Sequence, residues 1–223
     1  MKGISDLYRV FLRQEKGSTF LLVFFAVGLL AALTAVFFRQ TDAVPVIRSS
    51  VEIAAQTDQI LSHATTLRTA VQNIINNGID PANINDIIPS DAGFSTAPHT
   101  EKIYHPFGGG VTYYEDFQGW NNIVIHTNAR ITNVGPSTTA EIMAVGLIEE
   151  QALCQSINER LLGVTTITTV QDASFNNLEG GTAITLLDDT TVCTTGICNE
   201  RAFQCITNVS NDEYLFYNVL HAR

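Results

Sequence analysis

The sequence predicts an α+β fold: a long N-terminal helix, transmembrane and then amphipathic, packed on an antiparallel β-sheet head. Three observations predict it. The stretch from Phe20 to Phe38 is almost wholly apolar. Apolar residues then recur at helical spacing as far as Ile74, and β-branched and aromatic runs bounded by turn residues follow from residue 110 onward.

The apolar stretch has the length of a membrane span. No charged side chain lies between Lys16 and Arg39. As a helix, the 19 residues from Phe20 to Phe38 would rise about 28 Å, close to the roughly 30 Å of hydrocarbon in a bilayer. We therefore predict a transmembrane segment over about residues 18–38 and favour it over a buried core helix.

Basic residues precede this stretch, at positions 2, 9, 13 and 16. The positive-inside rule therefore places the N-terminus in the cytoplasm and the following chain outside the inner membrane. A cleaved secretory signal is the alternative. Such a signal has a shorter apolar core followed by small residues, whereas this stretch is longer and ends at Phe38-Arg39. We therefore expect a retained single-pass anchor.

The helical pattern continues beyond the apolar stretch. Its stripe consists of Val44, Ile47, Val51, Ala54, Leu61, Ala64, Leu67, Val71 and Ile74. Pro45 lies in this stripe and removes a backbone donor, so we predict a kink or a melted turn there. Gly78 suits the left-handed conformation that ends a helix. The predicted long helix therefore covers residues 18–78, and the head covers residues 79–223.

The head pattern predicts mostly strands. After a turn-rich stretch with a short helical piece at residues 83–88, strands are predicted at residues 110–114, 122–127, 164–170, 182–187, 202–207 and 213–220. One helix, from Ala140 to Leu162, is predicted between them because its apolar residues recur at helical spacing.

The four cysteines all lie in the last third of the chain, at Cys154, Cys193, Cys198 and Cys205. Disulfides fit an oxidising compartment outside the inner membrane, and four cysteines permit three pairings. A tetrahedral metal site is the alternative, but the sequence has no Cys-x-x-Cys pair. We therefore expect disulfides and no bound metal.

Signatures of enzymes are missing from the sequence. It has no Gly-x-Ser-x-Gly and no His-Glu-x-x-His. Nothing favours a membrane-anchored enzyme, so we expect neither catalytic residues nor a cofactor. The net charge of −10 and the pI near 4.8 argue against nucleic-acid binding, which needs a basic face.

The junction Glu15-Lys16-Gly17, followed by STFLLVFFAVGLLAAL, resembles the start of type IV pilins. In that superfamily a prepilin peptidase cuts after the glycine. The resemblance therefore implies a leader over residues 1–17 and cleavage between Gly17 and Ser18.

Three later stretches resemble type IVb pilins of the conjugative, PilS-like kind. They are TLRTAVQNIINNGIDPANINDIIPSDAGF, IYHPFGGGVTYY and LIEEQALCQSI. The second places Phe107, Gly108 and Gly109 in that family's aromatic–Gly–Gly turn. The third implies a disulfide from Cys154 to the C-terminal region, which favours Cys154–Cys205 and Cys193–Cys198.

One position departs from the pattern of major pilins. They usually carry a glutamate at the fifth residue after the cut, which pairs with the terminal amine of a neighbouring subunit. Here the fifth residue after Gly17 is Leu22, and no acid lies between Lys16 and Asp42. A lone carboxylate in lipid is costly, so the departure favours a minor or initiating subunit.

The sequence therefore predicts a structural subunit, and not an enzyme, of a type IV pilus or a related filament, secretion or conjugation machine. Expected partners are membrane lipid before assembly, other pilin subunits through the N-terminal helix, a prepilin peptidase and the inner-membrane assembly platform. Expected locations are the inner membrane before assembly, and the periplasm or an extracellular filament afterwards. The alternative is an unprocessed single-pass inner-membrane protein with a periplasmic binding head.

Overall fold

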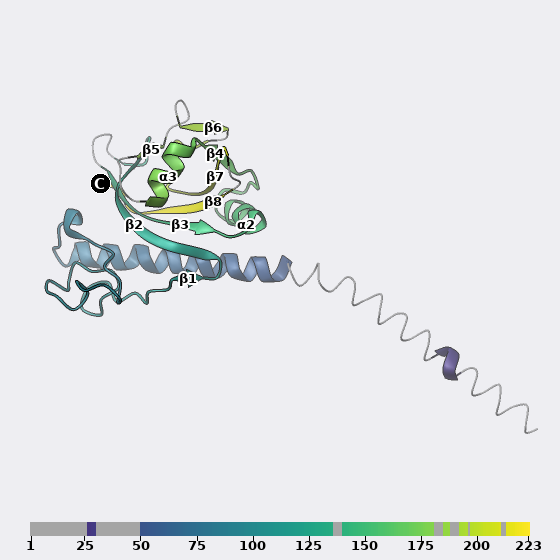
Figure 1. Cartoon of the computed structure of the whole chain (residues 1–223), viewed down its shortest axis with the longest axis horizontal. Helices are drawn as coiled ribbons and strands as arrows, with labels where there is room; N and C mark the ends of the chain where they lie inside the picture. Colours follow the sequence, from purple (N-terminus) through teal and green to yellow (C-terminus); the bar gives the residue numbers. More distant parts are fainter. Residues whose placement is uncertain are drawn as a thin grey trace, which may run out of the picture. The chain divides into compact units, whose positions relative to one another are not determined.

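The computed structural model describes residues 26–29, 50–135, 140–180, 185–187, 192–195, 197–210 and 213–223. The chain divides into two compact units, Met1–Val51 and Glu52–Arg223. Residues 26–29 in the first unit are helical, and their Val27 and Leu29 side chains are exposed. The second unit contains the sheet and the helices that pack on it (Figure 1).

The second unit begins within a helix that runs over residues 50–76. The elements after it are η1 (Pro81–Asn83), β1 (Asp116–Phe117), β2 (Trp120–Ile131), β3 (Glu141–Ile148), α2 (Gln151–Leu162), β4 (Thr168–Val170), α3 (Asp172–Gly180), β5 (Thr185–Leu187), β6 (Cys193–Thr195), β7 (Phe203–Asn208) and β8 (Tyr214–His221).

The strands form one 8-stranded mixed sheet in the order β1-β2-β3-β8-β7-β4-β6, with β5 paired to β2. Its centre is antiparallel, with Val145 of β3 opposite Tyr217 of β8 and Phe216 of β8 opposite Cys205 of β7. The pairs β2–β5 and β4–β7 are parallel. A parallel pair needs a crossover connection. The connection from β4 to its parallel partner β7 contains α3, β5 and β6.

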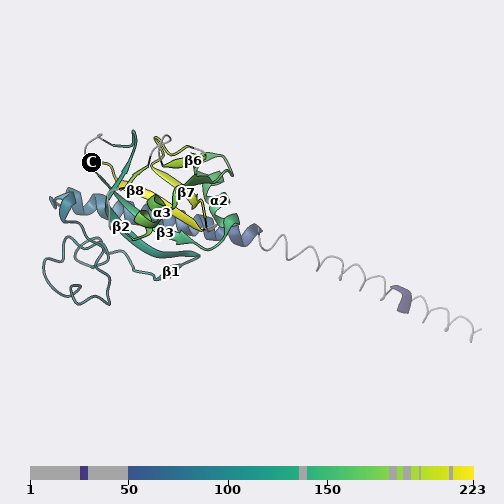
Figure 2. The same ribbon diagram turned by 45° about the horizontal axis from the view of Figure 1, so that its top comes forward.

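Helices cover both faces of this sheet (Figures 1 and 2). On one face, the helix of residues 50–76 and α2 bury Trp120, Ile142 and Phe216. On the other face, α3 packs Phe175 and Leu178 into a second core that also holds the disulfide cysteines of the β6 region. The central strands therefore have no face in water.

The predicted fold class is wrong in two respects. The sheet is mixed and not purely antiparallel, and it has helices on both faces. The predicted long helix, transmembrane and then amphipathic, is not seen, because none of the helices in the described residues is long and apolar enough to cross a bilayer.

The helix of residues 50–76 buries the second half of the predicted stripe: Ala64, Leu67, Val71 and Ile74 are all buried. The stripe differs nearer its start, where Ile60 is fully buried in place of Leu61 and Val51 is 63% exposed. The helix ends where the sequence predicts: Gly78 has a φ of +88°, and its N–H donates to the carbonyl of Ile75. Glycine adopts this left-handed conformation without a steric penalty.

The predicted helix from Ala140 to Leu162 is wrong in its first half. Residues Glu141–Ile148 form β3, and α2 begins only at Gln151. A strand buried on both faces is a continuous apolar run without alternation, and all but one of the β3 residues are buried. Hydrophobic periodicity alone does not separate such a strand from a helix.

Candidate functional site

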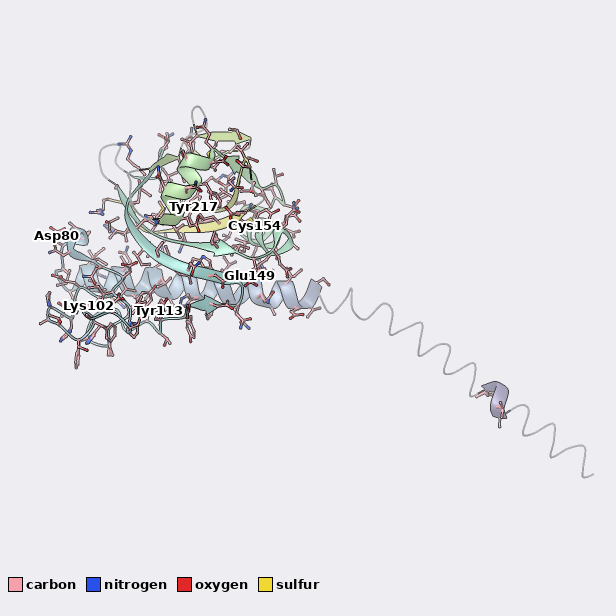
Figure 3. All side chains as sticks on the ribbon, in the orientation of Figure 1. Asp80, Lys102, Tyr113, Glu149, Cys154 and Tyr217 are labelled. Carbon is pink, nitrogen blue, oxygen red and sulfur yellow. A yellow bond between two sulfur atoms is a disulfide. The ribbon has the colours of Figure 1, made fainter. Side chains whose placement is uncertain are left out.

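The long connection between η1 and β1 is organised around a buried lysine. Lys102 is only 3% exposed, and its Nζ donates to the carbonyls of Gly93 at 2.6 Å, Phe94 at 3.1 Å and Thr96 (Figure 3). A buried ammonium group needs such partners. Lys102 therefore holds the loop of residues 93–96 against the chain that follows it.

The predicted aromatic–Gly–Gly turn begins five residues after this lysine, at Phe107. A Cβ atom on Gly108 would lie 2.1 Å from the carbonyl oxygen of Lys102, and one on Gly109 would lie 2.5 Å from that of Ile103. Only glycine permits this approach of two backbone segments. Phe107, in contrast, is 76% exposed. The two glycines therefore have a packing role.

The chain after the turn does not form the strand predicted at residues 110–114. It runs as an extended segment, and β1 begins only at Asp116. A hollow of about 320 Å³, here called the His63 cleft, opens between this segment and the helix of residues 50–76. It is lined by Gln59, Ser62, His63, Thr66, Val111, Thr112, Tyr114 and Phe117.

A second hollow of about 480 Å³ adjoins the His63 cleft along the same helix. The two share Ser62, Thr66 and Val111. The second one continues past Thr69 to Asn73. Together they form a groove with hydroxyl and amide groups on the helix side and with Val111, Tyr114 and Phe117 on the other side.

Aromatic rings surround the imidazole of His63. Its ring centroid is 4.4 Å from that of Phe117 in a stacked arrangement, 5.6 Å from that of Tyr114 and 6.1 Å from that of Trp120. Burial lowers the pKa of His63, because desolvation disfavours the charged imidazolium. The neutral ring is therefore the form that this environment favours at neutral pH.

Trp120 forms the floor beneath this cluster. It is fully buried, and a Cβ on Gly146 of β3 would lie 2.5 Å from its Nε1. Gly146 therefore leaves the space that the indole occupies beside β3. The ring of Phe216 lies 5.2 Å away, edge to face with the indole.

The structure joins Cys154 to Cys205 and Cys193 to Cys198. The expectation of disulfides is confirmed, and these are the pairs that the resemblance implied. The first ties α2 to β7. Asn158 strengthens the same junction: its Oδ1 accepts from the Cys205 N–H at 2.8 Å, and its Nδ2 donates to the Cys205 carbonyl at 2.9 Å.

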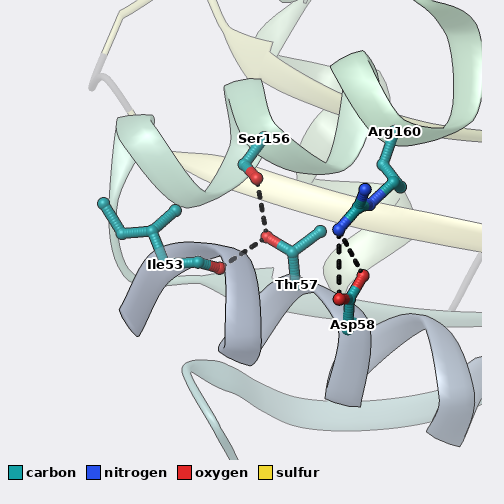
Figure 4. Close-up of polar contacts among 5 residues, drawn as sticks. All are labelled: Ile53, Thr57, Asp58, Ser156 and Arg160. Atoms are coloured by element: carbon teal, nitrogen blue, oxygen red, sulfur yellow. Dashed lines mark hydrogen bonds and ion pairs between the residues drawn. The ribbon is translucent and has the colours of Figure 1, made fainter. Parts of the chain in front are cut away.

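The helix of residues 50–76 also contacts α2 through polar groups (Figure 4). The buried Thr57 hydroxyl donates to the Ile53 carbonyl and shares a 2.8 Å hydrogen bond with the Ser156 hydroxyl. Arg160 pairs with Asp58 at 2.8 Å, but both side chains are more than half exposed. Such an exposed pair contributes little stability.

Titratable side chains in the described residues gather into no metal-binding cluster. None of them forms a group of three His, Cys, Asp or Glu residues that could hold a metal ion. His99 and His105 stack face to face at 4.2 Å. Glu141 is a buried carboxyl group that accepts from the Ile131 N–H at 3.1 Å, and burial raises its pKa.

Several predicted site residues lie outside the described residues. They are the predicted cleavage site, Gly17 and Ser18, and the predicted kink at Pro45. The predicted leader of residues 1–17 lies outside them as well, as does the predicted span except for residues 26–29.

Sequence reasoning missed three residues that organise the head: Lys102, His63 and Asn158. The partners of His63 and Asn158 lie in other segments of the chain. Lys102 binds backbone carbonyls, and every residue has one, so the sequence does not show which carbonyls will be used. The run Lys102-Ile103-Tyr104 offered one hint, since a lysine beside two apolar residues can be buried with them.

No family model, no curated protein and no solved structure matches this chain.

Proposed function

We propose that this protein is a structural subunit, and not an enzyme, of a type IV filament or a related secretion or conjugation machine. One observation carries the proposal. A charge-free apolar stretch follows Gly17, and the apolar stripe of the helix of residues 50–76 is covered by its own disulfide-bonded head.

The arrangement suits a subunit that moves from lipid into a filament. Before assembly, the apolar side chains of residues 20–38 contact lipid in the inner membrane. During assembly, the same side chains contact those of neighbouring subunits, so that apolar burial is kept throughout. The predicted partners in this process are a prepilin peptidase and the inner-membrane assembly platform.

The head supplies the rigid part of such a subunit. Its helix of residues 52–76 is fixed to the sheet by the buried side chains of Ile60, Leu67 and Ile74. The amide of Asn218 in β8 adds a hydrogen bond of 3.2 Å to the carbonyl of Ala64. Force or motion applied to the helix would therefore be transmitted to the sheet.

The lack of an acid in the apolar stretch favours a minor or initiating role. Leu22 occupies the position at which a major subunit would carry the glutamate that pairs with its neighbour. A subunit at the filament tip has no subunit above it and does not need that pair.

Cleavage of the leader tests the proposal. The full chain would be expressed with and without a prepilin peptidase, and the exported protein would be measured by intact mass. We expect residues 1–17 to be removed, which leaves Ser18 at the N-terminus, and we expect Gly17→Val to block removal. Gly3→Val, which lies within the same leader, is the matched control and should be processed normally.

A second readout is incorporation into filaments. In a strain with the peptidase and the assembly ATPase, the processed chain should be found in sheared filaments at a low ratio to the main subunit. An exported chain that keeps Met1 and never enters filaments would instead support an unprocessed single-pass protein with a periplasmic binding head.

A further inference from the structure

The His63 cleft has the chemistry of a binding site for an uncharged ligand. None of its lining side chains carries a formal charge when His63 is neutral. Gln59, Ser62, Thr66 and Thr112 offer an amide and hydroxyl groups instead. The chain as a whole has a net charge of −10, which disfavours anionic ligands.

The imidazole of His63 has no hydrogen-bond partner among the described residues. The side chain is only 7% exposed and lines the cleft. A neutral imidazole has one donor and one acceptor. The ring nitrogens of His63 are not among the fully buried polar atoms without a partner, so a ligand in the cleft could reach them. A ligand hydroxyl, which can both donate and accept, would satisfy either ring nitrogen.

The opposite wall of the cleft is aromatic. Tyr114 is 41% exposed, and its ring centroid lies 4.9 Å from that of Phe117. Two aromatic rings beside a row of hydroxyl groups form an amphipathic surface. A pyranose ring is amphipathic in the same way, because its C–H groups form apolar faces and its hydroxyl groups form a polar edge.

The size and the surroundings also fit a sugar. The volume of about 320 Å³ lies within the range of about 300–1,000 Å³ that is usual for ligand sites. Along the adjoining hollow, the hydroxyl groups of Thr66 and Thr69 donate to the carbonyls of Ser62 and Thr65. Their oxygens thus point acceptor lone pairs outward, and a longer saccharide could continue over them.

We propose that the His63 cleft binds a neutral saccharide, with a pyranose ring against Tyr114 and Phe117 and its hydroxyl groups on His63, Gln59 and Ser62. This goes beyond the proposed role in a filament and does not depend on it. It gives the head a ligand whether the chain is processed or not.

The test uses the full chain in micelles of lauryldimethylamine oxide, a detergent without a sugar headgroup. The probes are N,N′-diacetylchitobiose, cellobiose and lactose, with sialyllactose as the anionic comparison. Binding is measured by saturation-transfer NMR and by fluorescence. Trp120 is the chain's single tryptophan, and its ring lies 6.1 Å from that of His63, so its emission reports occupancy of the cleft.

We expect at least one neutral probe to bind saturably and to bind more tightly than sialyllactose. Tyr114→Ala should weaken that binding by about tenfold, which corresponds to about 1.4 kcal/mol. His63→Phe keeps an aromatic ring but removes both ring nitrogens, and it should weaken binding as well. The matched control is Phe107→Ala, which removes an exposed aromatic ring outside the cleft and should leave binding unchanged.

Three results would overturn the proposal. The first is no binding of any neutral probe at about 10 mM, tenfold above a dissociation constant of about 1 mM. The second is equal binding by Tyr114→Ala and the wild type. The third is concentration-dependent self-association that Tyr114→Ala abolishes, because the cleft would then be a contact between copies of the chain.

Discussion

Asn158 gives the sharpest test of how the head is held together. Its side chain joins α2 to Cys205 of β7. The parallel strand β4 pairs with β7 only from Ile206 onward, so Cys205 has no partner in β4. The amide takes the place of a neighbouring strand for Cys205: it accepts from the N–H and donates to the carbonyl. The substitution Asn158→Ala removes all of these bonds.

The magnitude follows from the groups left behind. Asn158 and Cys205 are both fully buried, and Asn158 also donates to the Thr166 carbonyl at 3.0 Å. The substitution leaves one buried N–H and two carbonyls without their partner, and each such group costs about 1–3 kcal/mol. Partial access of water to the vacated space lowers the sum, so we expect a loss of about 2–4 kcal/mol.

The assay is urea unfolding of the oxidised full chain, followed by the fluorescence of Trp120. Hydrogen exchange of the Cys205 amide is measured in parallel, because only this amide loses its acceptor directly. Glu159→Ala is the matched control: it lies next in α2, is exposed, and also places alanine in the helix. We expect it to change stability by less than about 0.5 kcal/mol.

The reasoning would be refuted by a small effect at Asn158. A loss below about 1 kcal/mol would mean that water replaces the amide without penalty. Unchanged protection of the Cys205 amide would mean that the hydrogen bond does not control its opening.

Three further predictions concern other parts of the head. Replacing Cys154 and Cys205 by serine opens a link of sequence separation 51 and should lower stability by about 4 kcal/mol on the loop-closure model, measured by urea unfolding; an unchanged midpoint would contradict it. Gly109→Ala should lower the melting temperature, because its Cβ would lie 2.5 Å from the Ile103 carbonyl oxygen. In the control Gly93→Ala, the new Cβ would make only ordinary van der Waals contacts, so the melting temperature should not change. Burial lowers the pKa of His63 below 6.5, so the neutral side chain contributes fully to stability above about pH 6.5, and this contribution is lost as the pH falls. His63→Phe should therefore flatten the fall in the urea midpoint between about pH 7 and pH 5. An unchanged dependence of the midpoint on pH would show that His63 is not the group responsible.

Much of the C-terminal half could be predicted from local patterns. The predicted strands at residues 122–127, 202–207 and 213–220 lie within or nearly within β2, β7 and β8. Strand β3 was predicted as a helix, because its burial on both faces removes the alternation that identifies a strand. The strand predicted at residues 110–114 has β-forming residues, but the segment lies along the groove and forms no strand.

Local sequence was enough to identify the apolar stretch before residue 39, the helix end at Gly78 and an even set of cysteines suited to disulfides. These are local properties of composition, spacing and backbone freedom. Three contacts came only from the folded arrangement: Asn158 bonds along the edge of β7 at Cys205, Lys102 binds three carbonyls and His63 lines a cleft. Each of these depends on groups that lie close together only when helix, loop and sheet have packed, and no periodicity along the chain records which distant groups will meet.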